Sequence, residues 1–120
     1  MIRILLVEDN HVFRESFKQS LHDHFPTVVI EEAASGEDAL QKVNGHPPPL
    51  IFMDLRLPRI NGLQATRKIK SAFPDIRIAI LTGYDVPEYR GAALKRGAEQ
   101  FFVKESLKWE GIEALVKSIE

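Results

Sequence analysis

Short apolar runs alternate along this chain with segments in which apolar residues recur every three or four positions. Phe13, Phe17 and Leu21, for example, stand four residues apart and would share one face of a helix. Five runs have the length and the β-branched or aromatic content of strands, and they lie at residues 4–7, 28–30, 50–53, 78–81 and 101–103. A strand followed by a helix, repeated five times, predicts an α/β domain with a parallel sheet.

Small and polar residues mark the ends of the predicted helices. Ser35 and Asn61 each precede a helical segment and carry a side chain that can cap it. Pro26 and Pro74 end the first and third helices, because the residue before a proline is disfavoured in a helix. Gly97 is expected to end the fourth helix. These signals give five strands and five helices.

The strands are continuously apolar rather than alternating, which indicates a sheet covered by helices on both faces. Right-handed crossovers leave few topologies, and the common order for a five-stranded doubly wound sheet is 2-1-3-4-5. That order places the ends of the first and third strands beside the crevice where such sheets bind ligands. The predicted fold class is therefore one doubly wound, flavodoxin-like (βα)5 domain that spans residues 1–120.

Composition narrows the function classes. With 16 Lys and Arg against 17 Asp and Glu, the formal net charge is −1, so direct binding to nucleic acid is not expected. The chain has no cysteine, which excludes disulfides and thiol nucleophiles. No apolar stretch approaches the roughly 18 residues of a membrane span, and no signal peptide layout is present. We therefore expect a cytoplasmic domain with no membrane partner.

The four histidines, His11, His22, His24 and His46, show no metal-ligand spacing on a common face, and we expect them to be solvated. Trp109 stands at the head of the last helix, where the simplest interpretation is a partly buried anchor.

The predicted strands end on side chains suited to phosphate chemistry. Glu8 and Asp9 follow the first strand and Asp54 follows the third. Carboxylates that lie close together need a cation unless one is protonated, and an all-oxygen set favours Mg²⁺, with Mn²⁺ also possible. Thr82 and Lys104, at the ends of the fourth and fifth strands, can bind phosphoryl oxygens. Asp54 lies between these groups and is the expected carboxylate acceptor of a phosphoryl group.

Four motifs together resemble the receiver domain of response regulators, the phosphoacceptor module of two-component signalling. The resemblance covers essentially the whole chain and implies the same strand order. The motifs are Val7-Glu8-Asp9-Asn10, Asp54-Leu55-Arg56-Leu57-Pro58 followed by Gly62, Leu81-Thr82-Gly83, and Phe101-Phe102-Val103-Lys104.

The resemblance implies a role for each member of the site. Asp9 and Asp54 would ligate Mg²⁺ directly, Glu8 would act through a water, and the backbone carbonyl of Arg56 would complete the protein's ligands. Asp54 would accept the phosphoryl group from a sensor histidine kinase, a phosphotransfer protein or a small phosphodonor. Self-phosphorylation and autodephosphorylation would be the only reactions, so the domain would not be an enzyme acting on an external metabolite.

The resemblance also implies a switch. Thr82 and Lys104 would bind the new phosphate, and Thr82 and Phe101 would change position together. Arg56 and Tyr84 would modulate how fast water removes the phosphoryl group. The surface from about residue 87 to residue 119 would then change to control a downstream protein or a C-terminal output domain.

Two positions depart from the common pattern. Glu105 stands where many receivers have a proline after the lysine, so a trans peptide bond is expected there. Phe101 replaces the usual tyrosine and can respond only by packing, because it has no hydroxyl. With the segments around Gly97 and Ile112, these features are similar to receivers of LuxR/NarL-type regulators with helix-turn-helix output domains. The resemblance also allows a homodimer that forms on phosphorylation.

Three alternatives compete with this interpretation. A degenerate receiver would bind a partner without being phosphorylated, which the complete acidic, threonine and lysine set argues against. A phosphohydrolase of the haloacid dehalogenase type needs a second acid two residues after the nucleophile, where this chain has Arg56. A flavodoxin-like cofactor binder is disfavoured because an acidic crevice would repel a flavin phosphate.

Overall fold

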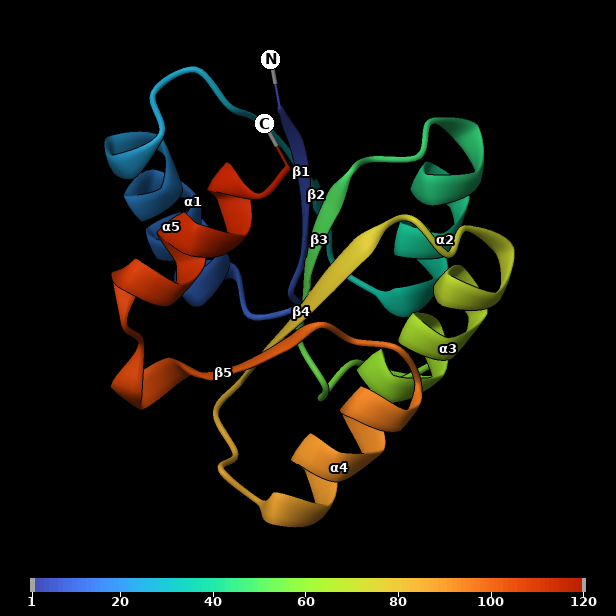
Figure 1. Cartoon of the computed structure of the whole chain (residues 1–120). Coiled ribbons are helices and arrows are strands. Elements are labelled where there is room, and N and C mark those ends of the chain that lie inside the picture. Colours follow the sequence, from blue (N-terminus) through green and yellow to red (C-terminus); the bar gives the residue numbers. More distant parts are fainter. Residues whose placement is uncertain (1, 120) are drawn as a thin grey trace.

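The computed structural model describes residues 2–119, and within them the chain folds as one parallel sheet between two layers of helices (Figure 1). The strands are β1 (Arg3–Val7), β2 (Val29–Ala33), β3 (Leu50–Met53), β4 (Arg77–Thr82) and β5 (Gln100–Val103). The helices are α1 (His11–His24), α2 (Gly36–Gly45), α3 (Gly62–Ala72), α4 (Pro87–Lys95) and α5 (Trp109–Lys117), with a short 3-10 turn, η1 (Lys104–Ser106). All strand pairs are parallel and the order is β2-β1-β3-β4-β5, which confirms the predicted fold class.

The two faces of the sheet are covered by different helices. Helices α1 and α5 pack on one face, and α2, α3 and α4 pack on the other (Figure 1). Neighbouring side chains of a strand therefore enter different cores: Ile51 faces α2 and α3, whereas Phe52 faces α1 and α5. Every residue of β3 is fully buried, which explains why the central strands are continuously apolar.

The predicted helix ends are confirmed. The Ser35 hydroxyl accepts the backbone N–H of Asp38 at 3.1 Å, and Asn61 forms a reciprocal capping box with Gln64. Gly97 follows α4 with a φ of 100°, a left-handed conformation that glycine adopts without the strain of a side chain. Where local chemistry marked an end, the chain follows it.

The second strand is longer than the apolar run predicts. It continues through Glu31 and Glu32 to Ala33, because β2 is an edge strand and its polar side chains can find partners at the surface. Arg3 pairs with Glu31 at 2.7 Å, and Arg14 pairs with Glu32 at 3.1 Å. Hydrophobicity alone could not show this extension, since Glu31 and Glu32 are polar and the strand continues through their backbone pairing with Leu5 and Leu6 of β1.

The segment after β5 differs from a simple strand-to-helix link. Lys104, Glu105 and Ser106 form the 3-10 turn η1 before α5 begins. No cis peptide bond occurs among residues 2–119, so the bond before Glu105 is trans, as predicted. No helix within this described part of the chain is long and apolar enough to cross a membrane.

Candidate functional site

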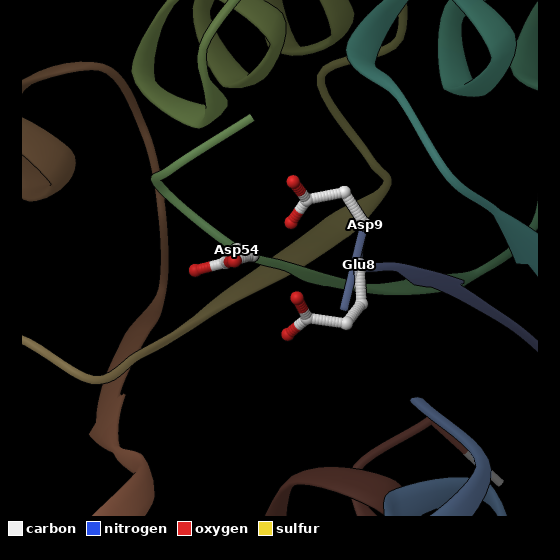
Figure 2. A group of neighbouring side chains, drawn as sticks. All are labelled: Glu8, Asp9 and Asp54. Carbon is white, nitrogen blue, oxygen red and sulfur yellow. The ribbon is translucent and has the colours of Figure 1, made fainter. Parts of the chain in front are cut away.

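Three carboxylates meet at the carboxyl end of the sheet, where β1 and β3 lie side by side (Figure 2). Glu8, Asp9 and Asp54 each offer an oxygen within 4.8 Å of the others. Glu8 and Asp54 are almost fully buried, with 1% and 5% of their surface exposed, whereas Asp9 is exposed. The sequence-predicted acidic cluster is therefore assembled in space.

An open cavity of about 550 Å³ lies over these carboxylates. It is lined by Glu8, Asp9, Asn10, Asp54, Arg56, Gly83, Tyr84 and Lys104. These residues come from the ends of four segments that are far apart in the sequence, so one pocket collects them only because the strands are parallel.

Backbone hydrogen bonds fix the positions of the carboxylates. The N–H of Asp54 donates to the carbonyl of Val7 at 3.0 Å and so continues the pairing of β3 with β1. Gly62 lets α3 begin directly against the loop between β3 and α3, because a Cβ at Gly62 would collide with the carbonyl oxygen of Asp54. Its N–H also donates to the carbonyl of Leu55 at 3.0 Å. The glycine in the sequence motif is thus required by close packing.

Helix α1 holds the other half of the acidic cluster. The guanidinium of Arg14 donates to the carbonyl of Glu8 at 2.7 Å, and the Glu8 carboxylate accepts the N–H of Asn10 at 3.0 Å. Asn10 in turn caps α1 by accepting the N–H of Phe13. The turn that carries Glu8 and Asp9 is therefore tied to the start of the helix.

Lys104 is the cation that faces these acids. Its Nζ lies 2.6 Å from Oε1 of Glu8 and 3.8 Å from Oδ2 of Asp54. Burial, reinforced by the nearby charge of Glu8, raises the pKa of Asp54 from 3.8 to about 7, although Lys104 acts in the opposite direction. One lysine thus leaves negative charge uncompensated, and an all-oxygen cluster with excess negative charge fits a hard divalent cation.

Thr82 and Phe101 lie beneath the cavity rather than on its lining. Thr82 is completely buried at the end of β4, and its hydroxyl accepts the N–H of Tyr84 at 3.2 Å. Phe101 is 7% exposed, and the guanidinium of Arg90 lies 4.7 Å from the centre of its ring. The structure places the predicted switch residues on adjacent strands, with Phe101 already packed into the core.

Arg56 and Tyr84 form a stacked pair at the rim of the cavity. The guanidinium carbon of Arg56 lies 4.3 Å from the centre of the Tyr84 ring. Both residues line the cavity over Asp54. The sequence motifs predict each residue near the site separately, and the structure adds that the two side chains contact each other.

Three features near the site were not predicted from the sequence: one lining residue of the cavity and two side-chain contacts. Asn10 lines the cavity, and its only signal was a polar residue directly after the acid pair. The ring of Phe13, expected only to pack on the helix face, lies 4.2 Å from the ammonium of Lys104. His24 is exposed, as predicted, and its ring also stacks on Trp109 with the ring centres 4.1 Å apart. Trp109 is partly buried against the core and stacks on the buried Phe17, which confirms the partly buried anchor predicted for it.

The comparisons with known proteins agree with this geometry. The family described as the response regulator receiver domain matches residues 4–117. This chain belongs to that family. It is therefore a receiver domain of two-component signalling, a signalling domain rather than a classical enzyme.

The relatives of this receiver domain are LuxR/NarL-type response regulators. The oxygen regulatory protein NreC of Staphylococcus carnosus is 39% identical over 104 residues, which are 86% of this chain and 48% of the relative. The transcriptional regulatory protein DegU of Brevibacillus brevis is 33% identical over 87% of this chain and 44% of its own length. The receiver domain spans about half the length of these curated relatives.

Solved structures share the fold over nearly the whole chain. The response regulator TrrA of Thermotoga maritima, in complex with Mg²⁺ and beryllium fluoride, is 31% identical with full coverage of both chains and a TM-score of 0.86. A LuxR-family response regulator from Aurantimonas sp. SI85-9A1 is 30% identical, with 98% of this chain and 84% of the other covered and a TM-score of 0.87.

Proposed function

We propose that this receiver accepts a phosphoryl group on Asp54 with the help of Mg²⁺. The observation that carries the proposal is the convergence of Glu8, Asp9 and Asp54 beneath an open cavity that also holds Lys104. Glu8, Asp9, Asp54 and the backbone carbonyl of Arg56 would hold the ion, and Mn²⁺ would fit the same oxygens. When bound, the ion supplies positive charge to the carboxylates and to the phosphoryl oxygens.

The reaction is a displacement at phosphorus. A carboxylate oxygen of Asp54 forms a new bond to phosphorus, and the bond from phosphorus to the donor's imidazole nitrogen breaks, with its electron pair staying on that nitrogen. Asp54 must be ionised to attack, and burial beside Glu8 opposes ionisation. Extra positive charge in the cavity lowers that pKa and so prepares the nucleophile.

Lys104 and Thr82 would bind the product. The ammonium of Lys104 already lies 3.8 Å from Asp54 and can exchange Glu8 for a phosphoryl oxygen. Rotation of the Thr82 side chain would turn its hydroxyl from the N–H of Tyr84 towards the phosphoryl group. That movement would change the packing around Phe101 and with it the surface of α4, β5 and α5.

The partners follow from the same assignment. The donor would be a sensor histidine kinase, a phosphotransfer protein or a small phosphodonor, and the site would act in the cytoplasm. We take residues 1–120 as one receiver unit that controls a downstream protein or a C-terminal output domain, in keeping with relatives about twice as long. The degenerate receiver is disfavoured by the complete set of acids and lysine around one cavity.

The decisive experiment is incubation with acetyl phosphate and Mg²⁺, followed by intact mass. The wild type is expected to gain one phosphoryl group that is labile to hydroxylamine, and Asp54→Asn is expected to gain none. Asp75→Asn, at an exposed aspartate, is the matched control and should behave as the wild type. An unmodified wild type, or an equal gain in Asp54→Asn, would reject the proposal. Sedimentation with beryllofluoride would then show whether activation creates a homodimer.

A further inference from the structure

The lysine of the site rests on an aromatic ring that belongs to a different element. Lys104 follows β5, whereas Phe13 lies in the first turn of α1. The ammonium lies 4.2 Å from the centre of the Phe13 ring, while it also contacts Glu8 at 2.6 Å. A cation at this distance from a ring is attracted to the electron-rich face.

We propose that Phe13 is a positioning residue that holds Lys104 in place for the phosphoryl group. This inference rests on the proposed function, since it concerns how Lys104 is presented to Asp54. Lysine has a flexible four-carbon side chain and loses much rotamer freedom when its ammonium is fixed. A ring beneath the ammonium, with Glu8 beside it, restricts the side chain before any phosphoryl group arrives. Pre-organised groups lose less freedom on binding.

The position of the ring is itself fixed by the core. Phe13 stacks on Phe17, with ring centres 5.7 Å apart and an angle of 13° between the planes. Phe17 contacts Phe52 of β3 edge-on at 5.2 Å and stacks on Trp109 at 5.6 Å. Phe17 is buried, so it cannot move freely. The ring below Lys104 is therefore set by α1, β3 and α5, independently of the charges in the site.

The first test measures the contact directly and does not depend on phosphorylation. In side-chain NMR, the methylene protons next to the Lys104 ammonium are expected upfield of ordinary lysines, because they lie over the Phe13 ring. Phe13→Leu should abolish this shift, and Phe73→Leu, at the end of α3, should retain it. A Lys104 signal at the ordinary position in the wild type would overturn the inference.

The second test asks whether the contact serves the reaction. With acetyl phosphate and saturating Mg²⁺, Phe13→Leu should slow phosphorylation about two- to fivefold, the effect of losing one cation–π contact. Phe73→Leu should leave the rate unchanged. In a Lys104→Met background Phe13→Leu should have no further effect, because the ring then has no ammonium to hold. An equal slowing in that background would mean that Phe13 only packs, and would refute the positioning role.

A further variant and the two separate measurements keep the outcomes distinct. Phe13→Met preserves apolar bulk without a ring, and it should reproduce the slowing if Phe13→Leu unfolds in a thermal melt. A wild type that takes up no phosphoryl group would remove the proposed function, while the NMR shift would still decide whether Phe13 holds Lys104. A wild type that is phosphorylated at the same rate as both Phe13 variants would remove only this inference.

Discussion

Replacing Asp54 with asparagine should make the metal-free domain more stable. The Asp54 side chain is almost fully buried beside Glu8, and the single nearby cation, Lys104, lies closer to Glu8 than to Asp54. Asparagine has nearly the same shape and no charge, and its amide can donate a hydrogen bond to a neighbouring carboxylate. The variant that abolishes the proposed reaction is thus expected to relieve a repulsion in the resting fold.

The magnitude follows from the pKa of Asp54, which is raised from 3.8 to about 7. The folded protein therefore holds this proton more tightly than the unfolded chain does. As the pH rises from about 3.8 to about 7, the free energy of unfolding falls, because the unfolded chain releases the Asp54 proton first. Above pH 7 the whole of this loss of stability is present. A shift of this size corresponds to about 4 kcal/mol. After a discount for solvent screening, we expect Asp54→Asn to gain about 2–4 kcal/mol in alkaline solution.

Urea unfolding of the wild type and Asp54→Asn, without metal, measures this gain. It should be largest at about pH 8.5 and should shrink by about half or more at about pH 5, where folded Asp54 is already protonated. Millimolar Mg²⁺ should also narrow the difference in free energy of unfolding between the two proteins, since it is expected to bind the ionised Asp54 of the wild type and so to stabilise the wild type more. Asp75→Asn should show no such dependence on pH. A gain that is absent at alkaline pH, or equal at both pH values, would refute the electrostatic reasoning.

Three other predictions test the loops around the site. Gly62→Ala should lower the free energy of unfolding by several kcal/mol in urea, because the alanine Cβ would collide with the β3–α3 loop. Gly45→Ala is the control: Gly45 has open space around it, so the substitution should raise the free energy of unfolding by about 0.5–1 kcal/mol. Arg59 has a φ of 60°, a left-handed conformation that β-branched residues adopt poorly and asparagine adopts readily. In the same urea assay Arg59→Val should lower the free energy of unfolding by about 1–2 kcal/mol and Arg59→Asn should lower it little. Equal losses in the two variants would contradict backbone strain at Arg59. Arg56→Ala and Tyr84→Ala should each shorten the lifetime of the phosphoryl group, and the double variant should add little, because the two side chains shield the site as one stacked pair. Timed loss of phosphoryl mass measures this, and unchanged lifetimes would exclude shielding.

The sequence predicted the layers because they follow from local patterns, whereas the strand order came from the common doubly wound topology and the resemblance to receiver domains. The buried β3 run is continuously apolar, and Ser35 and Asn61 cap helices through neighbours three residues away. The acids at the ends of β1 and β3 could be placed together because parallel strands bring their carboxyl ends to one edge. These features need only sequence neighbours and a topology rule.

Contacts between side chains of distant elements could not be predicted in the same way. The polar extension of β2 pairs with β1, and its glutamates form ion pairs with Arg3 and Arg14 from other elements. The stacking of Arg56 on Tyr84, and of Phe13 under Lys104, requires distances between elements that periodicity does not contain. The contact of the Arg90 guanidinium with the ring of Phe101 likewise joins two elements whose distance the pattern does not give.

The ion pair between Glu8 and Lys104 joins residues that are 96 positions apart. A ribosome makes the acidic residues early and the lysine near the end of this segment, so a growing chain carries Asp54 long before its neutralising partner exists. Until β5 is added, the acids lack that cation and the cavity lacks one wall. The ability to be phosphorylated is therefore expected only after the chain has been made through β5 and Lys104.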